Sequence, residues 1–329
     1  MLNVSAADIK DTLQWDALTG AVRDMFRRGC EMPARHHHKI KVAGEPDATL
    51  LLMPAWTPGG YLGTKILNVF PGNSERGLPS ISANYLLSSA KTGEMLALID
   101  GGELTAARTA AASALAASYL ARTDASHLLI VGTGRLAPLL ASAHASQRPV
   151  DTITVWGRTP DKAEALARDL TDQGMNAQAT DDLESAVGNA DIVSCATMAE
   201  ESLIHGEWLR SGTHLDLVGA YTPEMREADD EAVRRATVFV DTRDGAAKEA
   251  GDIVIPLATG VLSMDAIAAD LYDLCRGDHP GRAGDEEITL FKSVGVALED
   301  LAAAILFYEI KKDAYRISIN PDCPDELLV

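Results

Sequence analysis

The chain has 329 residues, of which 47% are hydrophobic, and this is enough core material for two domains of ordinary size. Its formal net charge of −19 at pH 7 argues against nucleic acid or an anionic membrane as a partner, because a surface of that sign repels phosphates. The four cysteines form no CxxC pair, which argues against a structural zinc site or a disulfide framework. The sequence shows no leader pattern and no run of about 18 apolar residues, so we expect a cytoplasmic protein.

The first hundred residues combine a helical segment with a region built from hairpins. Residues 4–30 carry apolar side chains at helical spacing, and Ser5 is a favourable N-cap residue. Between about residue 34 and residue 99, short runs of β-branched and apolar residues alternate with turns that contain glycine and proline. The runs are Thr49–Met53, Leu62–Val69, Ser80–Leu87 and Met95–Ile99. We therefore predict an antiparallel sheet here.

An alanine-rich segment, residues 102–122, predicts a long helix that links two domains. Beyond it, strand-like and helix-like stretches alternate, which predicts βαβ crossovers and a mostly parallel sheet. The expected strands are 127–131, 152–156, 177–180, 191–196, 214–218, 237–241 and 288–291, and the expected helices are 135–147, 160–171, 181–189 and 263–275. A last helix, residues 294–312, could return to the first domain and make it discontinuous. An irregular tail with two prolines follows it.

A glycine-rich turn, Gly132-Thr133-Gly134, follows the predicted strand 127–131 and precedes a helix with apolar periodicity. With Ala137 it forms the pattern GxGxxA, in which the glycines allow a tight turn and a close approach to a pyrophosphate, and the alanine allows close packing of helix and strand. The N-terminus of the helix also favours an anion. The alternative is an ordinary strand-to-helix turn. Because the context is the one that dinucleotide sites require, we predict a dinucleotide-binding domain.

The end of the next predicted strand indicates which dinucleotide is bound. In NAD-specific folds this strand ends in an acidic residue that binds the ribose 2′-hydroxyl, whereas here it is followed by Gly157-Arg158-Thr159. Arg158 offers a forked donor for a 2′-phosphate, and Thr159 offers a hydroxyl. Thr159 also suits the N-cap of a helix that begins at Pro160, and this role does not exclude the other. We predict NADPH as the cofactor, with NADH as the alternative.

Single cations stand out among the apolar and small residues of the first domain. Lys65 lies in a predicted strand, Arg108 lies in the alanine-rich helix, and Arg35 precedes the histidine triplet at 36–38. A pocket that holds two or three of these cations would suit a small carboxylate, but each cation could instead pair with one of the many acids. Adjacent histidines point to alternate faces of a strand and cannot easily share one ion, so we predict no metal site.

Six segments, in this order, resemble the ornithine cyclodeaminase/μ-crystallin family. They are the Lys65 strand followed by PGN, the Pro79-Ser80 stretch, GELTAARTAAASALAA, GTGRLA, VGAYTPEMRE and KSVGVALEDLAAA. The resemblance covers nearly the whole chain and implies a homodimer. It also implies a Rossmann-type doubly wound parallel sheet at residues 119–294, and a discontinuous α+β domain for substrate binding and dimerisation at residues 1–118 and 295–329.

The resemblance further implies roles for individual residues. By motif position, Lys65 and Arg108 hold the substrate carboxylate, with Arg35 as a third contact, and Ser80 lies near both nicotinamide and substrate. The glycine-rich turn and the family together suggest a set of cofactor contacts. These are Ser80, Arg108, Gly132, Thr133, Gly134, Arg135, Leu136, Arg158, Thr159, Thr197, Val218 and Ser293.

One departure separates the activities within this family. Ornithine cyclodeaminases carry an aspartate in the loop after the strand at 214–218, where this chain has Tyr221. The loop instead resembles that of the reductases that act on Δ1-pyrroline-2-carboxylate and Δ1-piperideine-2-carboxylate. We therefore predict a reductase that transfers a hydride to the imine carbon of a cyclic imino acid and forms L-proline or L-pipecolate.

The proton for the ring nitrogen could come from solvent, Lys65, Ser80 or Tyr221. The alternatives to the predicted activity are an alanine or other amino-acid dehydrogenase, an amine-condensing enzyme that acts on 2-oxo acids, and an ornithine cyclodeaminase of the same family. From another class comes an NADPH-binding protein without turnover, like the lens crystallins of the family.

Overall fold

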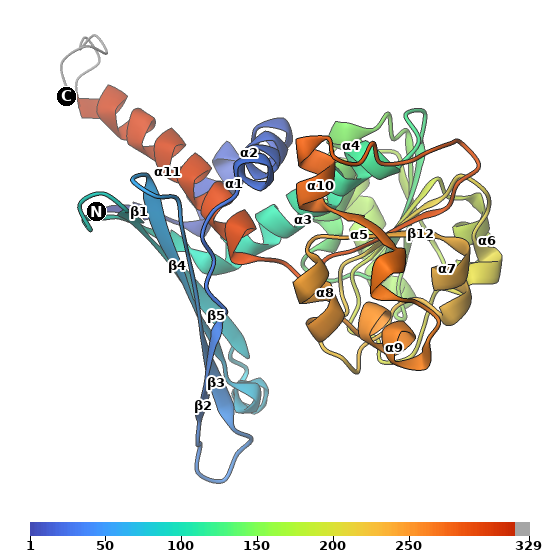
Figure 1. Ribbon diagram of the computed structural model, residues 1–329, viewed down its shortest axis with the longest axis horizontal. Coiled ribbons are helices and arrows are strands. Elements are labelled where there is room, and N and C mark those ends of the chain that lie inside the picture. The colour runs from blue at the N-terminus through green and yellow to red at the C-terminus, as the bar shows by residue number, and fades with distance from the viewer. Residues whose placement is uncertain (320–329) are drawn as a thin grey trace. The chain divides into compact units, whose positions relative to one another are not determined.

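The computed structural model describes residues 1–319 and contains two compact units. Among the described residues, unit 1 consists of 1–14, 28–108 and 297–319, and unit 2 of 15–27 and 109–296. In Figure 1, unit 1 thus combines blue N-terminal strands with the red C-terminal helix. Residues 15–27 and 109–118, which the sequence analysis places in the first domain, lie in unit 2. Helix α2 (Trp15–Arg28) packs there, and the rings of Phe26 and Tyr272 contact each other edge to face with centroids 5.1 Å apart.

Unit 1 is built on a six-stranded sheet. Its strands are β1 (Leu2–Val4), β2 (His36–Ile40), β3 (Ala48–Trp56), β4 (Tyr61–Val69), β5 (Ile81–Ser89) and β6 (Met95–Asp100). Their order is β1-β6-β5-β4-β3-β2, with antiparallel pairing from β2 to β6 and β1 parallel to β6. A short 3-10 helix, Pro71–Arg76, lies between β4 and β5. The predicted antiparallel sheet is thus confirmed, with β1 and β2 as additional strands.

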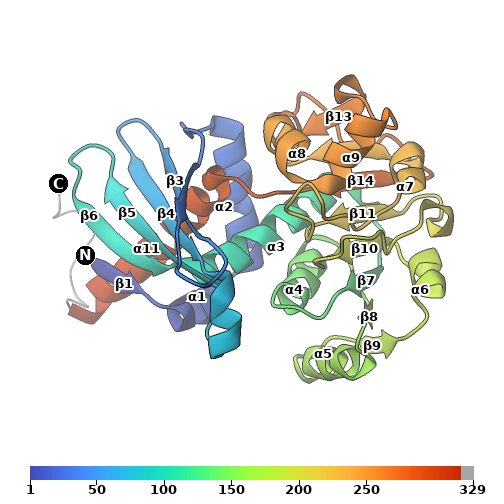
Figure 2. The ribbon, with the colours of Figure 1, turned by 90° about the horizontal axis from the view of Figure 1, so that it is seen from below.

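Helix α11 (Ala297–Ile319) packs on one face of this sheet, as Figure 2 shows. The side chains on the covered face follow the two-residue period of the strands, and Ala55, Tyr85, Leu87, Ala97 and Ile99 are fully buried. The Tyr61 hydroxyl donates to Glu309 in the middle of the helix. The last helix therefore returns to the N-terminal sheet, and unit 1 is discontinuous.

The segment 4–30 is largely helical, as predicted, but it forms two helices rather than one. Helix α1 (Ala6–Thr12) begins at the predicted N-cap, where Ser5 and Asp8 form a capping box: the Asp8 N–H donates to Ser5 Oγ at 3.2 Å and the Ser5 N–H to Asp8 Oδ2 at 2.9 Å. It ends at Leu13, whose ψ of 115° is extended. The apolar period continues across this break, which is why the sequence reads as one helix.

Unit 2 is an eight-stranded sheet in which all pairs are parallel. Its strands are β7 (His127–Val131), β8 (Thr152–Trp156), β9 (Ala177–Thr180), β10 (Ile192–Cys195), β11 (His214–Leu217), β12 (Thr237–Val240), β13 (Ile267–Asp270) and β14 (Thr289–Lys292). The order is β13-β12-β14-β11-β10-β7-β8-β9, and Figure 2 shows most of it. Alternate residues of β7 enter separate cores, Leu128 and Ile130 on one face and Leu129 and Val131 on the other. Both faces are covered, as in a doubly wound fold.

The helices that connect the strands of unit 2 agree with prediction at the start of the domain and differ near its end. They are α4 (Ala137–Gln147), α5 (Pro160–Asp172), α6 (Leu183–Asn189), α7 (Asp230–Arg235), α8 (Arg243–Glu249), α9 (Gly251–Thr259) and α10 (Leu271–Arg276). The predicted helix 263–275 is wrong, because a 3-10 turn, the four-residue strand β13 and the short α10 occupy it. Such short elements carry too few residues for a clear period.

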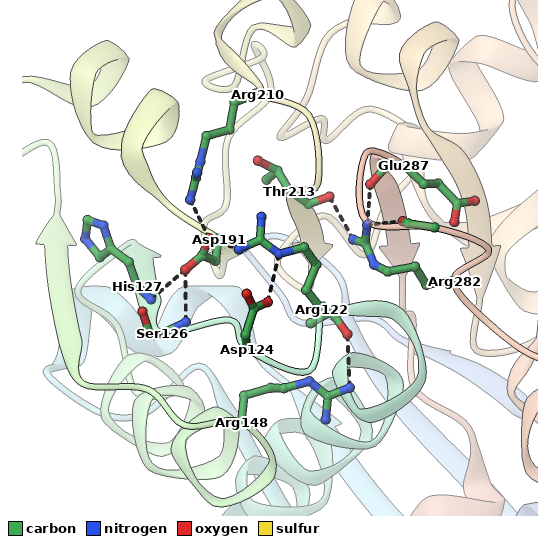
Figure 3. Close-up of polar contacts among 12 residues, drawn as sticks. Arg122, Asp124, Ser126, His127, Arg148, Asp191, Arg210, Thr213, Arg282 and Glu287 are labelled. Carbon is green, nitrogen blue, oxygen red and sulfur yellow. Dashed lines mark hydrogen bonds and ion pairs between the residues drawn. The ribbon is translucent and has the colours of Figure 1, made fainter.

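Helix α3 (Gly101–Leu120) ends in unit 2 at a group of arginines (Figure 3). Arg148 donates to the carbonyl oxygens of Ser118 at 2.7 Å and Ala121 at 3.0 Å, and Arg282 donates to that of Leu120 at 2.6 Å. These carbonyls have no partner within the helix, and cations also suit its negative dipole end. Among residues 1–319 no helix is long and apolar enough to cross a membrane.

We predict that Arg148→Ala lowers the free energy of unfolding by about 1–3 kcal/mol, because it removes a partly buried charged donor from two helix-end carbonyls. Chemical denaturation measures the change. The control is Arg234→Ala, which removes an exposed arginine that pairs only within its own helix and should change stability by less than about 0.5 kcal/mol. Equal stability of the two variants would contradict the role of Arg148 at the helix end.

Candidate functional site

The glycine-rich turn lies at the carboxyl end of β7, where the strand order of unit 2 reverses. Strands β8 and β9 follow on one side of β7. The next strand, β10, lies on the other side of β7, and β11 lies beyond it. In such sheets ligands bind outside the carboxyl ends of the strands at this switch point. Gly132 has a φ of 120°, and a Cβ there would lie 2.7 Å from the Ala196 carbonyl oxygen. The tight turn therefore requires glycine, as predicted.

Helix α4 begins at Ala137, two residues later than predicted, and its N-cap residue is Leu136. Leucine has no polar side chain to cap the helix, the Ala137 N–H donates to the Gly134 carbonyl at 3.1 Å, and Pro138 has no N–H, so no side chain caps this helix end. A Cβ at Gly134 would have no atom of a neighbouring residue within 4 Å, so the space beside the turn is open. Open space next to an uncapped helix N-terminus suits a phosphate group.

A pocket of about 500 Å³ opens at this turn. Its walls come from the ends of β7, β8, β10 and β11. They are formed by Gly132, Thr133, Gly134, Arg135, Leu136, Trp156, Gly157, Arg158, Thr159, Lys162, Ala196, Thr197, Met198, Ala199, Leu203, Val218, Gly219 and Tyr221. Every cofactor candidate that the sequence places in unit 2 lines this pocket except Ser293, which is buried and donates its N–H to the Leu217 carbonyl at 3.3 Å.

The charges in this pocket are of one sign. Arg135, Arg158 and Lys162 line it, and none of its lining residues is Asp or Glu, although the chain has 48 acidic and 29 basic residues. Thr159 takes the predicted N-cap position of α5, but its hydroxyl makes no capping hydrogen bond there. The pocket is therefore a concentration of positive charge in an acidic protein, and it suits a ligand with several negative charges.

A second cluster of charges is buried in unit 1, between β4, α3 and α11. Lys65 Nζ lies 3.2 Å from Asp300 Oδ1, and Arg108 Nε lies 3.0 Å from the same oxygen. Arg108 Nη1 also donates to Glu299 Oε2 at 2.6 Å. Two of the predicted cations are therefore brought together, and both are paired with carboxylates. The structure also places each where the sequence predicts, Lys65 in a strand and Arg108 in the alanine-rich helix.

The environment of Lys65 lowers its pKa to about 8. Burial is the largest cause, because the side chain is only 2% exposed, and the positive charges of Arg108 and Arg35 act in the same direction, whereas Asp300 raises the pKa. Lys65 can therefore release and regain a proton near neutral pH, unlike an exposed lysine. The third predicted cation, Arg35, lies close enough to act on Lys65 through its charge.

The other predicted residues of unit 1 lie apart from this cluster. Ser80 precedes β5, beside the strand pair Ile81–Val69, whereas Lys65 pairs with Tyr85 further along the same two strands. The histidines at 36–38 are exposed on β2. Among the residues that the structure describes, no three His, Cys, Asp or Glu side chains gather as metal ligands.

Several residues of these sites are not predicted from the sequence. Glu299 and Asp300 are hidden because they lie at least 190 residues beyond the cations they pair with. Lys162 lies in the first turn of α5, shortly after Arg158, and its position at the start of the predicted helix could have identified it. Glu227 belongs to the quoted VGAYTPEMRE segment, but no role for its side chain is visible there.

The model of the ornithine cyclodeaminase/mu-crystallin family matches residues 2–314. The chain is 39% identical over 303 residues to a Delta(1)-pyrroline-2-carboxylate reductase of Paracoccus denitrificans, which covers 92% of this chain and 94% of the relative.

Two solved structures are similar over nearly the whole chain. One is the Thermococcus litoralis Delta(1)-pyrroline-2-carboxylate reductase in complex with NADH and L-proline, with a TM-score of 0.87, 33% identity and coverage of 96% of this chain and 98% of that one. The other is an archaeal alanine dehydrogenase dimer with bound NAD, with a TM-score of 0.86, 29% identity and coverage of 95% and 97%.

Proposed function

Because the chain belongs to the ornithine cyclodeaminase/mu-crystallin family, we propose that it reduces cyclic imino acids, Δ1-pyrroline-2-carboxylate to L-proline or Δ1-piperideine-2-carboxylate to L-pipecolate. It is an oxidoreductase that uses a nicotinamide cofactor. The observation that carries the proposal is the buried cluster around Lys65 and Arg108, which offers a carboxylate-binding group with a titratable amine.

The donors of this cluster suit a ligand with a small carboxylate. Lys65 and Arg108 are paired with Asp300 and Glu299, and the half-buried Arg35 adds its positive charge beside them. Arginine and lysine also complement a carboxylate in geometry. A cyclic imino acid supplies one such group beside its reacting carbon.

We assign Lys65 as the proton donor. A bound nicotinamide supplies the hydride for the imine carbon, and the ring nitrogen takes one proton, so that the C=N bond becomes CH–NH. With a pKa of about 8, the Lys65 ammonium is largely protonated at pH 7 and can still release its proton. Asp300, at 3.2 Å, keeps the amine in place. Ser80 and Tyr221 are the alternative donors, and Tyr221 lies at the pocket in unit 2.

We propose NADPH as the preferred cofactor. The glycine-rich turn would hold the pyrophosphate, and Arg158 and Lys162, with the Thr159 hydroxyl, would hold a 2′-phosphate. The open N-terminus of α4 and the absence of acids from the pocket walls support this assignment. Thr197 and Val218 would contact the remainder of the dinucleotide, with Ser293 behind them.

We further propose that the chain forms a homodimer through unit 1. The face of the sheet opposite α11 carries Leu52, Pro54, Trp56, Ile66 and Leu86, all half-buried, and Figures 1 and 2 show no helix of unit 1 on it. A second copy of this sheet would cover these apolar side chains. The dimeric state of the archaeal alanine dehydrogenase supports the proposal.

A steady-state substrate panel tests the proposed activity. We expect turnover of pyrroline-2-carboxylate or piperideine-2-carboxylate with NADPH, little with pyruvate plus ammonia or methylamine, and none of ornithine with NAD⁺. Preference for pyruvate and ammonia would favour an alanine dehydrogenase, and ornithine turnover would contradict the interpretation of Tyr221. Tight NADPH binding without oxidation by any imine would favour a binding protein instead.

The pH dependence of kcat/KM tests the role of Lys65. The amine must be protonated to donate, so we expect kcat/KM to be constant well below pH 8 and to fall above it. Lys65→Arg should lower kcat/KM and abolish the fall near pH 8, because a guanidinium stays protonated and is a poor proton donor. Lys65→Met should reduce kcat/KM by about 10²–10⁴-fold. Wild-type kcat/KM in the Met variant would remove Lys65 from the mechanism.

The cofactor preference is tested by removing the two cations. We expect Arg158→Ala and Lys162→Ala each to raise KM for NADPH by about tenfold and to leave KM for NADH nearly unchanged, because each loses one charged contact to the 2′-phosphate. Arg168→Ala, on the same helix outside the pocket, is the control. An equal loss for both dinucleotides would show that these cations do not read the 2′-phosphate.

A further inference from the structure

The carboxylate of Glu227 lies behind the pocket and joins two segments of its wall. Oε1 accepts the backbone N–H of Thr197 at 2.7 Å and the Thr197 hydroxyl at 2.8 Å. Oε2 accepts the N–H of Gly219 at 2.7 Å and that of Ala220 at 3.4 Å. One buried side chain therefore receives hydrogen bonds from the segments that follow β10 and β11.

The two segments are also in direct contact. A Cβ at Gly219 would lie 1.9 Å from the Thr197 carbonyl oxygen and 2.3 Å from the Thr197 nitrogen. The backbones can approach this closely only because Gly219 has no side chain. Thr197 and Gly219 line the pocket, whereas Glu227 itself does not. A change in the hydrogen bonds of Glu227 would therefore shift the wall on both sides of this contact.

Glu227 is surrounded by other buried groups. Asp252 in α9 accepts the N–H of Glu227 at 2.8 Å and forms an ion pair with Lys292 at the end of β14 at 3.3 Å, and the Cys195 thiol of β10 is also close. Burial and the negative charge of Asp252 raise the pKa of Glu227 to about 7, whereas Lys292 and the Thr197 donors lower it. Both oxygens of the Glu227 carboxylate already accept hydrogen bonds. Protonation places a hydrogen on one of these oxygens, so at least one of the hydrogen bonds is lost.

We propose that Glu227 is a positioning residue of the dinucleotide site, whose ionised carboxylate holds the Thr197 and Gly219–Ala220 segments in the conformation that binds the dinucleotide. Protonation of Glu227 loosens both segments and weakens binding. This inference rests on the dinucleotide part of the proposed function and is independent of the identity of the imine. The acid lies behind the wall, so it acts through the backbone and makes no contact with the ligand.

Equilibrium binding of NADH between pH 6 and pH 8.5 tests this inference. NADH is the probe because it lacks a 2′-phosphate, which would itself titrate in this range. Quenching of tryptophan fluorescence reports binding, since Trp156 lines the pocket. We expect the wild-type Kd to rise as the pH falls below about 7. Glu227→Gln should raise Kd at pH 8 by about tenfold or more, because the amide NH2 group of glutamine would face N–H groups that need an acceptor. It should also remove the pH dependence, because the amide cannot ionise.

Two further variants separate positioning from general damage to the fold. Glu227→Asp keeps the charge but is shorter by one methylene group, and we expect it to bind more weakly than wild type while retaining the pH dependence. Asp191→Asn is the matched control, since Asp191 is a buried carboxylate that accepts two backbone N–H groups at the opposite end of β10. It should lower Tm and leave Kd at every pH unchanged.

The outcomes distinguish failure of this inference from failure of the proposed dinucleotide site. Failure of the wild-type protein to bind NADH or NADPH would refute the dinucleotide site itself. Wild-type Kd in a folded Glu227→Gln or Glu227→Asp variant would overturn only the positioning role. The positioning role would also be overturned if Asp191→Asn raised Kd as much as Glu227→Gln does. The rise in Kd would then follow the loss of stability rather than the position of the pocket wall.

Discussion

The ion cluster of Lys65, Arg108, Glu299 and Asp300 is the interaction on which unit 1 depends. It joins a strand, the helix that leaves the sheet, and the last helix of the chain. Buried cations without partners would be strongly destabilising, so the sheet needs the two carboxylates of α11 as much as it needs the apolar face of that helix. The discontinuity of unit 1 therefore has an electrostatic cause beside the hydrophobic one. Lys65 and Arg108 are also the cations of the proposed substrate site, which connects the fold to the proposed chemistry.

In unit 2, buried carboxylates hold backbone segments at both ends of the strands. Asp191 accepts two N–H groups before the strands begin, and Glu227, Asp241 and Asp252 accept N–H groups from segments that follow them. A carboxylate can accept several hydrogen bonds and has no donor of its own, so it suits segments whose N–H groups lack strand partners. Part of the acidic excess of this chain is thus internal and structural, whereas the charged side chains that line the pocket of unit 2 are all cations.

Local patterns predicted much of this architecture. The turn at Gly132 was found because its chemistry depends on neighbouring residues, and Lys65 and Arg108 stood out because cations are rare among alanines and β-branched residues. The partners of these cations could not be found in the same way, because Asp300 lies 235 residues beyond Lys65 and 192 beyond Arg108. Glu227 was missed for a related reason: the groups it binds are backbone N–H groups, which leave no trace in the residue types. The short elements near residue 267 lacked a readable period.

The return of α11 to unit 1 has a consequence for biosynthesis. The ribosome completes Lys65 and Arg108 long before it reaches Asp300, and the whole of residues 109–296 emerges in between. The two cations of unit 1 are therefore without the carboxylates of Glu299 and Asp300 while almost the whole of unit 2 is being made. Because these carboxylates follow unit 2 directly in the chain, the ion cluster of unit 1 can form only when synthesis of unit 2 is complete.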